Sequence, residues 1–452
     1  MSVDPKGGFV VALARTSLPI LLSRLAQTVA MVAGTIMLGR LGHQELAASA
    51  LATSLSIALF TFGSGTLFSL GPVFSRTRVA DDLLSIRQIF YHGLFLASII
   101  GLVIMLILFN AKYFLLAAGQ DPKLVALTQS YFDYLSFGVI PMLWITAIQQ
   151  LFIGIGQPVI VLIYSLIRLP LSILSAYLFI FGKWGLPAFG MAGLGLSISI
   201  LSAISCLILL AYLFFSVRFS TLFMFRARPL FQFDILTRIA HLGLPIGIQY
   251  SGEIAAYLVA TLFMGWIGQS ALVAQQITSQ YILLAMMIPF ALAQAVSVDV
   301  AGHLGANQYR TARLSGNIGV VMVLACMAIP SLLFVVFPSE LAQPFLKSSE
   351  DIVDVVHIAS LLFMIAAFSQ ILDAIRNVLG GALRAYDNTR NPMLAGIMAF
   401  WFIGLPLGYV LAFPLQFGVV GIPIGMATGI MIATVAVQRM YASELKQIVH
   451  RS

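Results

Sequence analysis

Two carboxylates, Glu253 and Asp373, stand deep inside long apolar stretches of a chain that holds few charges. An ionisable side chain in such a place is costly and therefore points to function. Loss of hydration favours the neutral form of a carboxyl group, so either residue could take up and release a proton. Carboxylate oxygens also bind Na⁺ or pair with an organic cation. The two residues are therefore candidates for one cation-binding site.

Polar side chains lie about one helical turn from each carboxylate and share its face if the stretches are helical. We expect them to support the site. The alternative is architectural: Asp373 pairs with Arg376 one turn on, and Glu253 only hydrogen-bonds a neighbouring amide or hydroxyl. The supporting residues are Gln249 and Tyr257 around Glu253, and Gln370 and Asn377 around Asp373.

The elements that position these residues follow from composition. The 452 residues are 60% hydrophobic and only 9% charged, whereas soluble domains are about 45–50% apolar and about 25% charged. The mean hydropathy is +1.01, so the polar side chains cannot cover a water-soluble surface. The net charge of +8 does not indicate nucleic-acid binding, because excess Lys and Arg in such a chain lie in cytoplasmic loops. The chain is predicted to be a polytopic protein of the lipid bilayer.

A transmembrane helix needs about 20 mostly apolar residues. By that measure the chain contains twelve candidate spans. The predicted fold is all-α, with bent helices where prolines lie within spans. The spans are centred near Thr28, Leu59, Ile100, Pro141, Leu171, Ser202, Ser251, Met287, Val323, Ser369, Phe402 and Ile430.

The two halves of the sequence resemble each other. Leu-Pro-Ile at 18–20 recurs at 244–246, and Leu-Pro-Leu at 169–171 recurs at 405–407. Six spans per repeat is an even number, so both halves enter the membrane from the same side and form two lobes related by a pseudo-two-fold axis along the membrane normal. This duplication favours a monomeric transporter over a channel built from several subunits. The predicted parts are an N-lobe (residues 1–220, helices 1–6), a cytoplasmic linker (221–235) and a C-lobe (236–452, helices 7–12).

The repeat also makes the carboxylates a property of one lobe. The position equivalent to Glu253 at the repeat offset is Gln27, a neutral amide, and the position equivalent to Asp373 is Ala147. A purely architectural role predicts more symmetry between the lobes. Gln27 is therefore the predicted neutral counterpart of the site in the N-lobe.

Loop charges indicate the orientation. With the N-terminus inside, cytoplasmic segments carry sixteen Lys and Arg residues and the opposite side carries five. This imbalance predicts a multi-pass protein of the inner (plasma) membrane with both termini in the cytoplasm. The remaining basic residues, Arg24, Arg168 and Arg376, lie inside spans, where they could line a cavity, pair or snorkel. Asp299 and His303 are four residues apart near a cytoplasmic helix end, where anchoring is favoured over metal binding.

Three segments carry a family resemblance. The stretch from Glu253 to Ile277 resembles the seventh-to-eighth helix signature of the multidrug and toxic compound extrusion (MATE) family. Residues 302–313 look like that family's stretch after the eighth helix. Asp373 followed by LGGALRAYDNTRNP at 379–392 is similar to its tenth-to-eleventh helix signature. The resemblance covers essentially the whole chain.

The resemblance implies an antiporter that exports varied, mostly cationic organic compounds in exchange for H⁺ or Na⁺. The Glu253 and Asp373 arrangement resembles the NorM-like branch, in which Na⁺ could bind at these two carboxylates. The chain departs from many bacterial members at Gly34, where they carry an Asp in the first helix. A mechanism based on an N-lobe carboxylate is therefore not expected, and the coupling ion stays open between H⁺ and Na⁺. No cofactor is expected.

Two alternatives compete with this interpretation. A lipid-linked oligosaccharide flippase of related fold would need a cationic cavity to hold pyrophosphate, and two carboxylates in the site argue against an anionic cargo. A membrane-embedded transferase or hydrolase would need a catalytic constellation, and only the pair of Asp299 and His303 suggests one. The sequence shows no ATP-binding or nucleophile motif, so we do not expect an enzyme.

Overall fold

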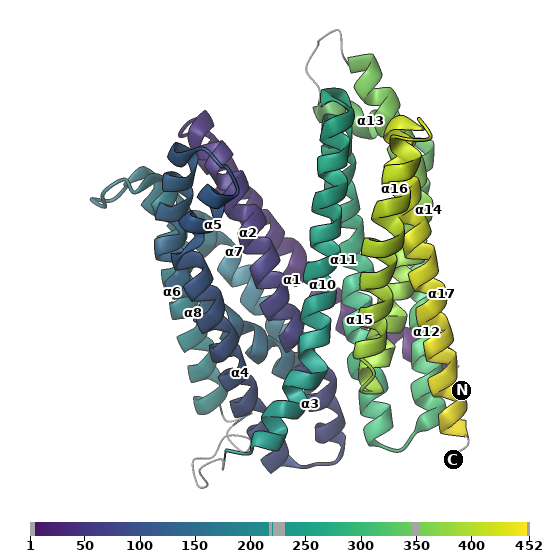
Figure 1. Ribbon diagram of the computed structural model, residues 1–452. Coiled ribbons are helices and arrows are strands. Elements are labelled where there is room, and N and C mark those ends of the chain that lie inside the picture. Colours follow the sequence, from purple (N-terminus) through teal and green to yellow (C-terminus); the bar gives the residue numbers. More distant parts are fainter. Residues whose placement is uncertain (1–4, 217–218, 220–230, 346–351, 450–452) are drawn as a thin grey trace. The chain divides into compact units, whose positions relative to one another are not determined.

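The computed structural model describes residues 5–216, 219, 231–345 and 352–449. Every regular element within those ranges is a helix (Figure 1). Twelve helical segments there are long and apolar enough to cross a membrane, which confirms the predicted all-α fold.

The first half contains α1 (Pro5–Gly39), α2 (His43–Leu67), α3 (Leu70–Val79), α4 (Leu83–Phe109), α5 (Ala111–Ala117), α6 (Pro122–Gly154), α7 (Pro158–Phe181) and α8 (Gly190–Phe215). The second half contains α10 (Phe233–Ile267), α11 (Gln269–Gly305), α12 (Tyr309–Val336), α13 (Pro338–Ala342), η1 (Gln343–Phe345), α14 (Ile352–Ala385), α15 (Arg390–Ile397), η2 (Met398–Gly404), α16 (Leu405–Ala412), η3 (Gly418–Val420) and α17 (Gly421–Val449).

Local sequence sets several helix ends. Asp82 caps α4 by accepting a hydrogen bond from the Ser85 amide at 3.0 Å, and the Ser85 hydroxyl donates to the same carboxylate. Asp121 caps α6 by accepting from the Lys123 amide at 2.8 Å. Both contacts satisfy amides that have no partner inside the helix. Gly182 ends α7 in the left-handed region at φ 64°, a conformation that glycine adopts without strain.

The eleventh span changes its winding part-way. It runs as α15, then as the π-helix η2, then as α16. Pro406 stands in the first turn of α16, where a residue without an amide hydrogen is tolerated. The wider turns of η2 come just before it, and such π segments are frequent at functional sites.

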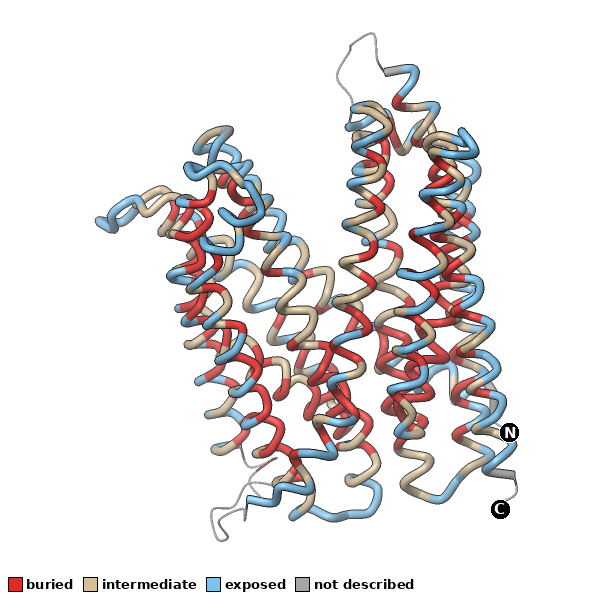
Figure 2. Tube along the Cα trace, viewed as in Figure 1, coloured by how far each residue is buried: buried red, intermediate tan, exposed pale blue. Residues whose placement is uncertain are grey.

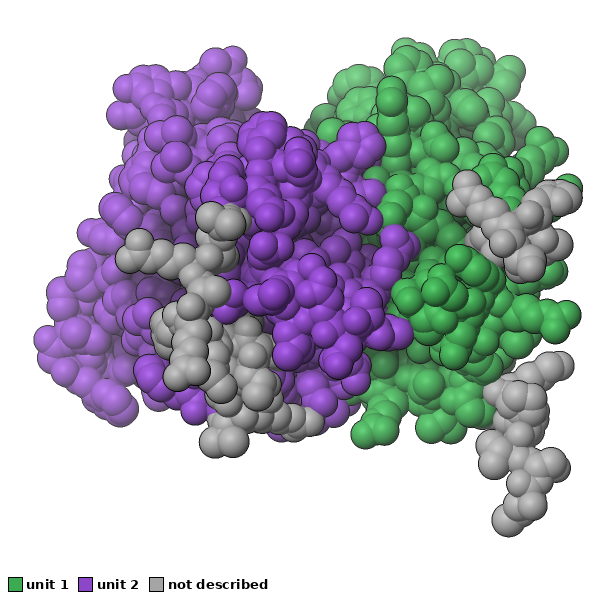
Figure 3. All heavy atoms as spheres, turned by 90° about the horizontal axis from the view of Figure 1, so that it is seen from below, with its two compact units in different colours: residues 1–21, 248–452 green, residues 22–247 purple. Residues whose placement is uncertain are grey.

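Contacts divide the chain into two compact units (Figure 3). The C-terminal unit comprises residues 1–21 and 248–452, and the N-terminal unit comprises residues 22–247. Both boundaries fall inside helices, within α1 and within α10. The predicted lobes of 1–220 and 236–452 have different boundaries and stay a prediction. Residues 221–230 of the predicted linker lie outside the described part of the chain, and α10 begins at Phe233.

Close packing accounts for both boundaries. At Gly243 and Gly247 of α10, an added Cβ would meet the backbone oxygens of Thr66 and Phe62 in α2. The first part of α10 therefore packs against the N-terminal unit. The start of α1 belongs with the C-terminal unit, and the Phe9 ring lies edge-on to His303 of α11 at 5.8 Å.

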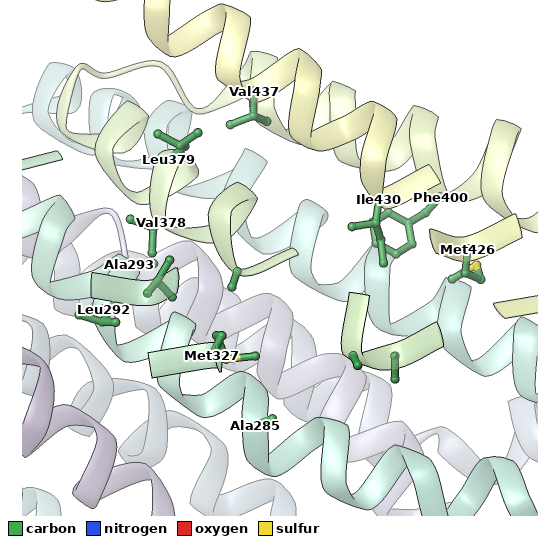
Figure 4. Packing of buried hydrophobic residues seen from close by; sticks show 14 of the residues in the cluster. Ala285, Leu292, Ala293, Met327, Val378, Leu379, Phe400, Met426, Ile430 and Val437 are labelled. Atoms are coloured by element: carbon green, nitrogen blue, oxygen red, sulfur yellow. The ribbon is translucent and has the colours of Figure 1, made fainter. Parts of the chain in front are cut away.

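The buried core of the C-terminal unit lies where α10, α11, α12, α14 and α17 meet. Within each unit, buried positions form stripes along the helices rather than whole circumferences (Figure 2). The remaining faces carry many exposed apolar side chains, as expected of helices that face lipid. Figure 4 shows part of this core, with Ala285, Leu292, Ala293, Met327, Val378, Leu379, Phe400, Met426, Ile430 and Val437 labelled.

Candidate functional site

Glu253 and Asp373 lie in one buried cluster inside the C-terminal unit, and Arg376 joins them. The Arg376 guanidinium donates from Nη1 to Glu253 Oε1 at 2.6 Å and from Nη2 to Glu253 Oε2 at 2.9 Å. It also donates from Nε to Asp373 Oδ1 at 2.8 Å. The side chain of Glu253 comes from α10, and those of Asp373 and Arg376 come from α14. We call these three residues the charge cluster.

The charge cluster is almost completely removed from solvent. Glu253 is 8% exposed, Asp373 4% and Arg376 2%. Two carboxylates against one guanidinium leave a formal net charge of −1. A bidentate guanidinium–carboxylate pair is among the stronger charge-assisted contacts, and breaking it in a buried place is costly because it leaves an uncompensated charge.

The predicted supporting residues differ in how they contact the cluster. Gln249 donates from Nε2 to Glu253 Oε1 at 3.0 Å, as expected from its place one turn away. Asn377 donates instead to the main-chain oxygen of Asp373 at 2.9 Å. Gln370 is 2% exposed, and its Oε1 has no hydrogen-bond partner within the described part of the chain. The Gln370 oxygen is therefore an unsatisfied acceptor one turn before Asp373.

Aromatic residues close one side of the cluster. The Arg376 guanidinium carbon lies 5.4 Å from the centre of the Phe400 ring, within the range of a cation–π contact. Tyr257 meets the same ring edge-on at 5.7 Å. Phe400 belongs to η2, so the π-helical segment contributes a wall of the site.

Gly396 of α15 brings backbone close to the carboxylate. A Cβ added there would lie 3.0 Å from Glu253 Oε1 and 3.5 Å from Arg376 Nη1. Any larger residue at this position would therefore press directly on the ion pair.

The sequence analysis did not predict that Arg376 contacts both carboxylates. Its pairing with Asp373 has a sequence signal, because residues three apart share a helical face. The pairing with Glu253 has none, because 123 residues separate the two partners. The structure contains both contacts of the architectural alternative, Asp373 with Arg376 and Glu253 with an amide, and adds the ion pair that links them.

The other charged candidates have separate surroundings. Asp299 accepts a hydrogen bond from the Ser315 hydroxyl at 2.6 Å and lies 3.6 Å from His303 Nε2. No group of three or more potential metal ligands occurs among the residues described here. These contacts fit helix anchoring, as expected for Asp299 and His303.

Gln27 belongs to the N-terminal unit and lines a cavity of about 220 Å³ there. Arg168 lines the same cavity, and it contacts the hydroxyls of Tyr164 and Ser202 at 3.1 and 2.8 Å. Arg24 lies over the Phe68 ring at 5.2 Å.

In the described part of the chain, twelve helices are long and apolar enough to cross a membrane, and charged groups are buried among them, which is the architecture of a multi-pass membrane protein. The family model MatE matches residues 19–178 and again residues 245–410. Two matches of one model agree with the predicted sequence repeat. The chain belongs to the MATE family, whose members are transporters and not enzymes.

Curated relatives and solved structures agree with this assignment. A probable multidrug resistance protein NorM of Agrobacterium fabrum is 32% identical over 424 residues, which cover 92% of this chain and 90% of the relative. A probable NorM of Bradyrhizobium diazoefficiens is 29% identical and covers the same share of this chain, with 89% of its own length matched. These relatives are named as bacterial multidrug resistance proteins, and this chain is a multi-pass inner-membrane protein of the same transporter family.

The fold is that of solved MATE structures. An outward-facing multidrug resistance MATE transporter matches with a TM-score of 0.87 at 17% identity, over 99% of this chain and 97% of its own. The eukaryotic MATE transporter AtDTX14 matches with a TM-score of 0.85 at 19% identity, over 99% and 100% of the two chains.

Proposed function

We propose that this chain exports organic cations in exchange for H⁺ or Na⁺, and that both compete for the charge cluster of Glu253, Asp373 and Arg376. The observation that carries the proposal is the formal net charge of −1 in a place that is almost completely removed from solvent, with Glu253 the most exposed of the three residues. An excess charge there attracts one monovalent cation, whether a proton, a sodium ion or the ammonium group of a drug.

Arg376 sets how many positive charges the two carboxylates can still bind. Two free carboxylates could accept two positive charges, but the guanidinium already compensates one of them. One monovalent organic cation therefore leaves as one H⁺ or Na⁺ enters, and the exchange carries no net charge across the membrane. Phe400 and Tyr257 add aromatic surface against which an apolar cation can pack.

The test is drug efflux from vesicles that contain the purified protein, with a pH gradient and a Na⁺ gradient imposed separately. E253Q and D373N should each abolish gradient-driven efflux of a monovalent dye such as ethidium. D299N is the matched control, because it neutralises an in-span carboxylate outside the cluster, and it should retain efflux. The parent protein's efflux should not change when a membrane potential is imposed.

Two results would overturn the proposal. Near-parental efflux in both E253Q and D373N would show that the cluster has only an architectural role. Efflux that follows neither gradient would remove the coupling by H⁺ or Na⁺.

Orientation and assembly belong to the same proposal. We expect both termini in the cytoplasm, and a monomer as the working unit. Labelling of R228C from the cytoplasmic side only and of K347C from the outside only would support the orientation. Labelling of both from one side would contradict it.

Neither alternative function gains support from the site. The positive charge of Arg376 is already compensated by Glu253 and Asp373. Arg376 is therefore not available to bind the pyrophosphate of a lipid-linked oligosaccharide. Asp299 and His303 belong to no group of three or more potential metal ligands among the described residues, and the Ser315 hydroxyl donates its hydrogen bond to Asp299 rather than to a histidine base.

A further inference from the structure

The cavity of the N-terminal unit has the opposite polarity to the charge cluster. Its volume is about 220 Å³. Polar groups come from Gln27, Tyr164, Arg168 and four serines, Ser165, Ser172, Ser175 and Ser197. Apart from Gly34, the rest of the lining is alanine, leucine, isoleucine and methionine side chains. None of the described residues that line it is acidic, so Arg168 gives this lining a formal charge of +1.

The Arg168 guanidinium is only partly satisfied. It donates from Nη1 to the Tyr164 hydroxyl at 3.1 Å and from Nη2 to the Ser202 hydroxyl at 2.8 Å. A guanidinium has five N–H donors, and within the described ranges Arg168 forms no ion pair. Both contacts are to neutral hydroxyls, which compensate a positive charge less well than an anion does.

A second polar group of the cavity also lacks a partner. Ser165 lies three residues before Arg168 on α7, so both share one helical face. Its side chain is 3% exposed, and its hydroxyl oxygen has no hydrogen-bond partner within the described residues. A ligand oxygen held by Arg168 could accept from this hydroxyl as well.

The charge is specific to this half of the repeat. Leu-Pro-Leu at 169–171 corresponds to Leu-Pro-Leu at 405–407, so Arg168 corresponds to Gly404. The negative charge cluster thus has a neutral counterpart at Gln27, and the positive charge has a neutral counterpart at Gly404. Inherited architecture does not account for either charge.

We propose that this cavity is a binding site for a small organic carboxylate, which Arg168 holds through its guanidinium. The volume is below the range of about 300–1,000 Å³ that is usual for drug-sized ligands, so the ligand is small. The apolar part of the lining fits an aromatic or aliphatic body behind the carboxylate.

The depth of Arg168 separates this ligand from a lipid headgroup. Its Cα lies about 15 Å along the axis from the start of α7 at Pro158, at 1.5 Å per residue. That depth is near the middle of a hydrocarbon core of about 30 Å. Lipid phosphates lie at the surface of the bilayer, whereas a small carboxylate can diffuse into a cavity.

The proposal is tested by isothermal titration calorimetry, which measures the binding of sodium benzoate to the purified full-length protein in detergent. Benzamide has the same shape without the charge and should bind at least 10-fold more weakly. R168Q should weaken benzoate binding by about 10- to 100-fold, because it removes a charged hydrogen-bond donor. R40Q is the matched control, since Arg40 is an exposed arginine beyond the end of α1, and it should bind benzoate as the parent does.

G34D provides a second variant that does not depend on the folding of R168Q. Gly34 lines the same cavity, and an added Cβ there meets only the flexible end of Leu194, at 3.2 Å. The new carboxylate would occupy the cavity beside Arg168 and should abolish benzoate binding. E253Q should bind benzoate like the parent. The benzoate measurement therefore tests the cavity independently of the transport assay that tests the charge cluster.

Several outcomes would overturn the proposal. They are equal binding of benzoate and benzamide, unchanged binding in G34D or in a folded R168Q, and equal competition by chloride at the same ionic strength. Binding of benzoate that is lost when phosphatidylglycerol is added would assign the site to a lipid instead.

Discussion

Replacing Arg376 by Gln is the most direct perturbation of the charge cluster. In the parent, one guanidinium serves both carboxylates, and the cluster carries −1. R376Q leaves Glu253 and Asp373 buried without a cation and changes the formal charge to −2. Breaking a buried ion pair from one side costs about 3–5 kcal/mol. At about 2 °C per kcal/mol for a unit of this size, the thermal midpoint should fall by about 6–10 °C.

A second substitution should recover part of that loss. R376Q/E253Q removes one of the two buried negative charges that R376Q leaves without a cation. We therefore expect the double variant to recover about half of the fall in the thermal midpoint. Such a gain from a second mutation is a coupling between the two positions, which is what a double-mutant cycle measures. The assay is thermal unfolding of the purified variants in detergent at one pH, in which midpoints are compared rather than equilibrium free energies.

Arg384 provides the matched control cycle. It is a buried arginine of the same helix, 7% exposed, and it contacts the ring and hydroxyl of Tyr250 rather than a carboxylate. E253Q should therefore not rescue R384Q. A parental midpoint in R376Q, or the same rescue in both cycles, would refute the idea that the guanidinium compensates two desolvated charges.

Three further predictions concern other positions. G396A should slow gradient-driven dye efflux at least several-fold in a protein that still folds, because the new methyl group presses on Glu253 Oε1; unchanged efflux would contradict this. D82A should lower the unfolding free energy by about 1 kcal/mol through loss of the α4 cap. Hydrogen bonds from the Ser85 hydroxyl and amide lower the pKa of Asp82 in the folded protein. The stabilisation by Asp82 is therefore fully present at pH values above the ordinary carboxyl pKa and is lost as the pH falls through the lower pKa of the folded state. The melting midpoints of the parent and D82A should therefore converge at strongly acid pH. D299N should retain efflux and lose about 1 kcal/mol or less, and loss of transport with an unchanged melt would instead give Asp299 a functional role.

The sequence was sufficient for the helices and for the two carboxylates. Spans are long apolar runs, and a rare charge inside such a run is visible by inspection, which is why the burial of Glu253 and Asp373 could be predicted; their role in transport stays a prediction. Gln249 could also be placed, because its contact with Glu253 is set by the pitch of a single helix.

The remaining parts of the site depend on contacts between helices. Arg376 lies beside Glu253 only because α10 and α14 pack together, and no spacing in the sequence encodes that distance. Phe400 reaches Arg376 from a π-helical segment, which the apolar pattern of the eleventh span does not distinguish from ordinary helix. The boundaries inside α1 and α10 are also set by tertiary packing, because each helix looks continuous as a sequence.

The π-helix η2 has a consequence for how chains of this kind can change in length. Loss of one residue from an α-helix turns everything beyond it by about 100°, which would place the lipid-facing side chains of a span inside the protein. Residues 398–404 already hold a surplus residue relative to α-helical winding. A deletion there would tighten the winding to an ordinary helix and leave the flanking α15 and α16 in register. Phe400 would move and Arg376 would lose its aromatic neighbour, so the site could diverge while the scaffold around it stays the same.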